Sequence, residues 1–254
     1  MLKEKDNKLR LQFDIHTIEH LGVQMYKTLP PVLAELISNS YDADASCVTI
    51  VFEDSIEHKS IMVTDDGCGM TFEELNGSFL KIGRNRRRHS NDITPYGRKV
   101  TGRKGLGKLA IFGVANEIEV QTVKNNLKNV FVMNLKDILN TDKEYLPQIV
   151  VYNQHVDVPN GTTIILRDIQ RRSAFDIENL KESLSKRFNF TDPNFYIELQ
   201  KNGVEPQKIT SETKWEYIEP QFQWEFPKDD ISEDNYAINK GITGKIISTE
   251  KPLG

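Results

Sequence analysis

Four strand-like segments follow one another between residues 117 and 169, and this run constrains the fold more than any other feature of the chain. The segments are EIEVQTV, NVFVMNL, QIVVYNQ and GTTIILRDI, each rich in β-branched residues. Two earlier segments, CVTIVFE and KSIMVTDD, have the same character and are joined by the polar turn DSIEH. A helix-like segment, VLAELISNSYDA, precedes them, and Pro30 and Pro31 suit its first turn. This order predicts a two-layer α/β sandwich with a mixed sheet and helices on one face.

Shorter sequence patterns predict the helices and the loop that lie outside these segments. Residues 14–26 have helical periodicity, and Thr71 with Glu74 forms the pattern of a capping box at the start of a short helix. The stretch from 80 to 104 is polar, basic and broken by glycine and proline, which predicts a long loop. The segment GLGKLAIFGVA then predicts a helix that opens at glycines.

A change of pattern after residue 168 indicates a second domain. Polar residues lead into a helix-like segment, IENLKESLSKRF, a strand, FYIELQ, and a turn at Asn202-Gly203. A chain of 254 residues also exceeds the roughly 100–200 residues of a typical domain. We therefore predict an α/β domain over 1–170 and the beginning of a second, truncated α/β domain over 171–254.

Composition excludes several classes of protein. No apolar run approaches the roughly 20 residues of a membrane span and the start lacks a signal peptide, so a cytoplasmic location is expected. The two cysteines, Cys47 and Cys68, lack metal-ligand spacing and are expected to be thiols. The net charge of −4 argues against a surface that is basic all over, although basic residues cluster between Arg84 and Lys108.

Three polar motifs are candidates for chemistry. Glu35, Asn39 and Asp42 stand at i, i+4 and i+7 of the predicted helix, so they share a face within roughly 60°. A solvated polar stripe would have the same pattern. The second motif, Asp65-Asp66-Gly67-Cys68-Gly69-Met70, directly follows an apolar strand. Its glycines permit close approach of a ligand and its carboxylate can accept hydrogen bonds from an amino group, but an ordinary turn would look alike.

The third motif runs from Gly102 to Lys108 and enters a helix. Backbone N–H groups at a glycine-rich helix start can bind phosphate, and a flexible hinge is the alternative. The segment fits G-x-x-x-x-G-K, but Leu109 stands where a P-loop needs Ser or Thr, and no strand precedes it. No Rossmann fingerprint follows the first strand either. Each motif alone occurs by chance in about 3–10% of such chains, but the ordered set in about one in ten thousand.

This ordered set resembles the GHKL, or Bergerat-fold, superfamily of ATPases. The matching patterns are E-x-x-x-N-x-x-D-A at Glu35–Ala43, D-x-G-x-G at Asp65–Gly69 and G-x-x-G-x-G at Gly102–Gly107. The strings ELISNSYDA and TDDGCGMT are similar to the chaperone, MutL and MORC members. A sensor kinase needs a phosphoacceptor histidine on a two-helix module. The segment that contains His16 and His20 shows no such module, so a histidine kinase is disfavoured.

The resemblance implies a role for each motif residue. Glu35 would polarise the attacking water, Asn39 would coordinate Mg²⁺, and Asp65 would bind the adenine amino group, assisted by Thr162 through water. The glycines would admit the base and wrap the phosphates. The implied ATP-binding residues are Asn39, Asp42, Asp65, Gly67, Gly69, Met70, Gly102, Lys104, Gly105, Leu106, Gly107, Lys108 and Thr162.

The resemblance also implies an output. Residues 80–104 would form a lid over ATP, two copies would associate when ATP binds, and a basic residue of the following domain would reach the γ-phosphate. The expected function is therefore Mg²⁺-dependent ATP hydrolysis in a nucleotide-gated dimeric machine, with DNA as a possible partner. An ATP-sensing module with little turnover and a protein-remodelling chaperone are the alternatives.

Overall fold

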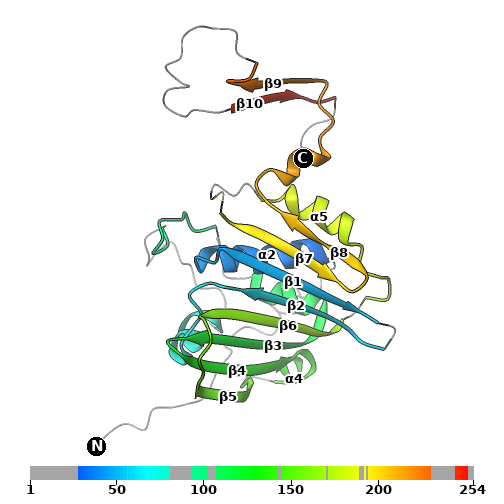
Figure 1. Ribbon diagram of the computed structural model, residues 1–254. Helices are drawn as coiled ribbons and strands as arrows, with labels where there is room; N and C mark the ends of the chain where they lie inside the picture. Colours follow the sequence, from blue (N-terminus) through cyan, green and yellow to red (C-terminus); the bar gives the residue numbers. More distant parts are fainter. Residues whose placement is uncertain are drawn as a thin grey trace, which may run out of the picture. The chain divides into compact units, whose positions relative to one another are not determined.

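The computed structural model describes residues 28–55, 57–80, 93–101, 107–141, 145–169, 171–188, 192, 194–229 and 244–250 (Figure 1). The helix predicted over 14–26 and most of the predicted lid lie outside these ranges. The chain divides into two compact units, 1–211 and 212–254.

The first unit is built around an eight-stranded sheet, with the order β5-β4-β3-β6-β2-β1-β7-β8 (Figure 1). All neighbouring pairs are antiparallel except β1 and β7, which are parallel. This arrangement confirms the predicted mixed sheet. The strands are β1 (Cys47–Asp54), β2 (Lys59–Asp65), β3 (Ala115–Lys124), β4 (Leu127–Asn134), β5 (Gln148–His155), β6 (Gly161–Ile169), β7 (Tyr196–Lys201) and β8 (Val204–Ile209).

Helices cover one face of this sheet. They are α2 (Leu29–Asp42), α3 (Phe72–Glu74), the π-helical turn η2 (Leu75–Phe79), the 3-10 helix η4 (Gly107–Gly113), α4 (Leu135–Leu139) and α5 (Ile177–Ser185). Figure 1 shows α2 and α5 on the same side of the strands. Alternate strand residues such as Val48, Ile50 and Phe52 are buried against α2 side chains such as Leu33 and Ile37. The alternation buries one face of each central strand, which is the physical basis of the two-layer sandwich.

Two short helices form where local patterns in the sequence predict them. The Thr71 hydroxyl accepts a hydrogen bond from the Glu74 N–H while the Glu74 carboxylate accepts one from the Thr71 N–H, so the capping box is confirmed. The helix expected at the glycine-rich motif is a 3-10 helix in the described residues.

The expected domain boundary at residue 170 requires correction. Strand β7 pairs in parallel with β1, and β8 pairs with β7, so residues 196–209 extend the first sheet. Helix α5 packs its buried Leu180 and Leu184 into the same core. The first compact unit therefore ends at Ser211. The sequence does not indicate this boundary, because the pairing of β7 with β1 joins segments that are far apart in the chain and leaves no local signal.

The second unit contains the 3-10 helix η5 (Thr213–Tyr217) and an antiparallel pair, β9 (Phe222–Phe226) and β10 (Gly244–Ser248). Among the helices that the structure describes, none is long and apolar enough to cross a membrane.

Candidate active site

The Asp65 carboxylate is held at the end of β2 by donors from three parts of the fold. Its Oδ1 accepts hydrogen bonds from the backbone N–H of Gly67 at 3.0 Å and of Thr162 at 3.2 Å. Its Oδ2 accepts one of 2.8 Å from the buried hydroxyl of Ser40 on α2. Burial raises the pKa of Asp65 above the ordinary aspartate value, and the hydrogen bonds oppose this rise. The result is a fixed carboxylate on the helix-covered side of the sheet.

Two glycines allow the turn after Asp65 to pack closely. A Cβ atom at Gly67 would lie 2.8 Å from the Ala43 carbonyl oxygen, just after α2. Gly69 has a φ of +62°, and a Cβ there would lie 1.9 Å from the Val123 carbonyl oxygen. The motif therefore needs glycine for close contact with α2 on one side and β3 on the other.

Thr122 on β3 fastens this turn to the sheet. Its buried hydroxyl accepts a hydrogen bond of 2.8 Å from the Met70 N–H and donates one of 3.2 Å to the Gly161 carbonyl. It also lies 3.4 Å from the Thr162 hydroxyl. The structure thus places the Thr162 N–H on Asp65 and the Thr162 hydroxyl beside Thr122, and a water-mediated role for that hydroxyl stays a prediction.

Helix α2 carries Glu35 and Asn39 as well as Ser40, the residue that donates to Asp65. Glu35 and Asn39 are half-buried, whereas Leu36 and Ile37 are buried in the core. Within the described ranges, the Asn39 carboxamide makes no hydrogen bond with another residue. Because Ser40 next to Asn39 contacts Asp65, the first two motifs of the sequence meet at one place.

Asp42 has a different environment from the other two motif residues of α2. Its Oδ1 accepts hydrogen bonds from the Thr101 N–H at 2.7 Å and from the Thr101 hydroxyl at 2.9 Å. Asp42 therefore contacts the residue that immediately precedes the third motif. Its predicted role toward ATP stays a prediction.

The third motif is described only in part. Gly107 and Lys108 begin η4, but the side chain of Lys108 lies outside the described residues. The predicted phosphate ligands Gly102, Lys104, Gly105 and Leu106 also lie outside them. Their roles stay predictions.

Sequence reasoning missed Ser40 and Thr122. Ser40 stands between Asn39 and Asp42 on the same helix, and this adjacency is the one signal that could have identified it. Thr122 lies in a strand and is surrounded by ordinary strand residues. No local signal distinguishes it, because its partners Met70 and Gly161 lie far away in the sequence.

A cavity of about 370 Å³ opens at the same end of the sheet and includes Asp65 in its lining. Much of its lining comes from the face without helices, including Thr49, Thr64 and Thr163. Glu35 and Asn39 are absent from this lining because α2 lies on the opposite face. The candidate site is therefore the helix-covered side of Asp65, where the first two motifs meet.

Two relatives and one family model show what this chain is similar to in sequence. A protein named as a type II restriction enzyme, HgiDII of Herpetosiphon aurantiacus, is 34% identical over 192 residues, which cover 74% of this chain and 31% of that protein. The DNA mismatch repair protein MutL of Christiangramia forsetii is 24% identical over 179 residues, 68% of this chain and 27% of that protein. The chain thus spans less than a third of the length of each of these relatives. Residues 26–184 match the model of the histidine kinase-, DNA gyrase B- and HSP90-like ATPases, and the chain belongs to that family.

Proposed function

We propose that this domain binds ATP with Mg²⁺, hydrolyses it, and drives a dimeric machine that acts on DNA. The observation that carries the proposal is the meeting of α2 and the Asp65 turn, joined by the hydrogen bond from Ser40 to Asp65. It brings a base-binding carboxylate next to the helix that carries Glu35 and Asn39. Family membership supports ATP as the ligand.

Asp65 would recognise the adenine base. Its Oδ1 and Oδ2 are oriented by Gly67, Thr162 and Ser40, so an amino group can be bound without reorganisation of the site. A carboxylate accepts from the adenine amino group but repels the carbonyl oxygen found at that position in guanine. The site therefore favours ATP over GTP.

Asn39 would hold Mg²⁺. Its carboxamide oxygen is the hard ligand that Mg²⁺ prefers, and it is not engaged by another described side chain. Mg²⁺ usually takes few protein ligands and completes its shell with phosphate oxygens and water, so one amide fits this role. When bound, the ion would neutralise charge on the phosphates.

Glu35 would act as the general base, one turn of α2 before Asn39. A carboxylate within hydrogen-bond reach of the attacking water can accept its proton as that water attacks the terminal phosphate. The P–O bond to ADP then breaks, and phosphate and ADP leave.

The output on DNA rests on the relatives. One is named as a restriction enzyme and the other as a DNA mismatch repair protein, and both are much longer than this chain. We infer that ATP binding brings two copies together and that segments outside the matched region act on DNA.

The test is a comparison of wild type, Glu35→Gln and Glu53→Gln. Glu53 is exposed on the face without helices, so it is a matched control for the same substitution. We expect Glu35→Gln to reduce Mg²⁺-dependent phosphate release by about 10²–10⁴-fold while ATP binding persists, and Glu53→Gln to match wild type.

Other results would replace the proposal. Tight ATP binding by wild type without turnover would identify a sensing module. Nucleotide-dependent binding of unfolded client proteins, and not of DNA, would identify a chaperone. Absence of ATP binding by wild type would overturn the proposal altogether.

A further inference from the structure

Residues 93–101 form a compact turn just before the glycine-rich motif. Ile93 and Lys99 make an antiparallel bridge. The Thr94 N–H donates to the Arg98 carbonyl at 2.8 Å, and the Gly97 N–H donates to the Thr94 carbonyl at 2.9 Å. We call this segment the basal turn. Its internal hydrogen bonds make it a compact local unit.

Three carboxylates hold the basal turn against the rest of the fold. Asp42, at the end of α2, accepts from Thr101, as described above. Asp44, two residues later, accepts from the Thr94 hydroxyl and, at 3.3 Å, from the Tyr96 N–H. Asp192, between α5 and β7, accepts from Arg98. Two of the three attachments thus lie at the C-terminal end of the helix that carries Glu35 and Asn39.

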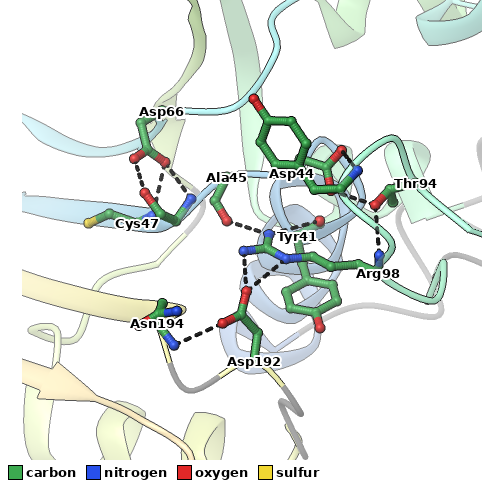
Figure 2. A network of polar contacts seen from close by, with 11 residues as sticks. Tyr41, Asp44, Ala45, Cys47, Asp66, Thr94, Arg98, Asp192 and Asn194 are labelled. Atoms are coloured by element: carbon green, nitrogen blue, oxygen red, sulfur yellow. Dashed lines mark hydrogen bonds and ion pairs between the residues drawn. The ribbon is translucent and has the colours of Figure 1, made fainter.

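Arg98 lies at the centre of these contacts (Figure 2). Its Nε and Nη2 donate to Asp192 Oδ2 at 3.0 and 2.6 Å. Its Nη1 donates to the carbonyl oxygens of Ala45 and, at 3.4 Å, Tyr41. The guanidinium carbon lies 4.6 Å from the centre of the Tyr41 ring, and the side chain is only 10% exposed. One side chain therefore joins the basal turn, the end of α2 and the segment before β7.

The chemistry of each contact suits arginine. A cation at a helix C-terminus is favoured by the helix dipole, and a planar guanidinium can stack on an aromatic ring while it donates in its plane. The Asn194 N–H and Arg98 lower the pKa of Asp192, so this carboxylate is ionised at neutral pH. Lysine has the same charge, but its single ammonium group cannot make all these contacts.

We propose that Arg98 is a positioning residue for ATP binding, which docks the basal turn on α2 so that the chain enters the glycine-rich motif at a fixed place relative to Asn39 and Glu35. The inference rests on the proposed function. The docked arrangement is the binding-competent one. When a substitution lowers the population of the docked arrangement, the apparent affinity for ATP falls in proportion. Saturating ATP restores the docked arrangement, because ATP binds to it preferentially. The result is a raised KM with little change in kcat.

The experiment compares Arg98→Ala, Arg98→Lys, Asp192→Asn and the double variant Arg98→Ala/Asp192→Asn. Arg167→Ala is the matched control, because Arg167 forms ion pairs with Glu117 and Glu119 on the face without helices. Thermal unfolding is measured first, and ATP affinity and steady-state kinetics are then measured well below the lowest Tm. The less severe Arg98→Lys and Asp192→Asn variants serve if Arg98→Ala does not fold.

We expect Arg98→Ala to raise Kd and KM for ATP about tenfold or more, the outcome if the docked population falls to about a tenth. Arg98→Lys and Asp192→Asn should lie between it and wild type, and the double variant should add little to Arg98→Ala. Arg167→Ala should lower Tm without changing KM. The inference is overturned if Arg98→Ala lowers Tm and leaves KM within twofold of wild type. If wild type itself does not bind ATP, the proposed function fails with it.

Discussion

The Ser40 hydroxyl on α2 donates a 2.8 Å hydrogen bond to Asp65 Oδ2 at the end of β2. This contact joins the first two motifs through residues that lie 25 positions apart in the chain. It ties the helix that carries Glu35 and Asn39 to the carboxylate assigned to the base. In the proposed function, one buried hydroxyl thus links base recognition with phosphate chemistry.

Asp65→Asn should weaken ATP binding by about tenfold to a hundredfold. The substitution removes a charged acceptor, and hydrogen bonds to charged groups are worth about 1.5–3 kcal/mol. Asp66→Asn is the neighbouring control, because Asp66 accepts hydrogen bonds from the Ser46 N–H and from the Cys47 N–H (Figure 2) instead. Calorimetric titration with ATP measures both. Equal affinities for the two variants would contradict the assignment of Asp65.

Ser40→Ala should reduce ATP affinity severalfold and shift its pH dependence. Burial already raises the pKa of Asp65, and loss of the Ser40 donor raises it further because the ionised form loses a hydrogen bond. In the proposed function the ionised form binds the adenine amino group. ATP affinity should therefore fall as the pH drops through this pKa, and the fall should begin at higher pH in the variant.

Ser60→Ala is the control for this pH experiment, because Ser60 donates to Glu53 on the face without helices. Titrations of ATP affinity from neutral to acidic pH compare the three proteins. Superimposable profiles for wild type and Ser40→Ala would exclude the proposed link.

Gly69→Ala should destabilise the fold far more than Gly203→Ala. Both glycines have positive φ, at +62° and +77°, which costs a side-chain-bearing residue about 1–2 kcal/mol. At Gly203 the new Cβ meets nothing within 4 Å, but at Gly69 it overlaps the Val123 carbonyl. Urea unfolding measures the difference. Equal losses for the two variants would show that the turn around Gly69 relaxes freely.

The buried Asp54 carboxylate should contribute stability that is lost in acid. It accepts hydrogen bonds from Lys59, from Lys201 at 2.7 Å and from the Phe175 N–H at 2.8 Å. The Asp54 side chain is only 6% exposed. Burial alone would raise the pKa of Asp54, but these donors hold it well below the usual range. A lowered folded-state pKa gives stability at neutral pH that is lost progressively below about pH 5.

Asp54→Asn tests this prediction by urea unfolding at several pH values. The variant should be less stable than wild type at pH 7, and the gap should narrow as the pH falls. Other carboxylates, including Asp66 and Asp192, also have lowered pKa values, so the difference between the two proteins is the informative quantity. A gap that is constant with pH would refute the prediction.

Local patterns in the sequence were sufficient for most elements of the sheet and for the capping box at Thr71. Alternation in β1 and β2, and the apolar runs of β3 to β6, follow from which side chains face the core. The ordered motifs also identified the family, because glycine, carboxylate and amide at those positions are rare in combination. Strand alternation, the capping box and the motifs all depend on residues that are close together in the chain, so the sequence alone is enough to identify them.

Only the tertiary structure decided which segments meet. The pairing of β7 with β1 moved the end of the first unit to Ser211, and Thr122 entered the site from β3. The joining of Arg98 to Asp192 likewise links residues 94 positions apart. Such contacts depend on the packing of the whole sheet and helix layer rather than on local preference, so the motifs determined the chemistry and the fold determined its geometry.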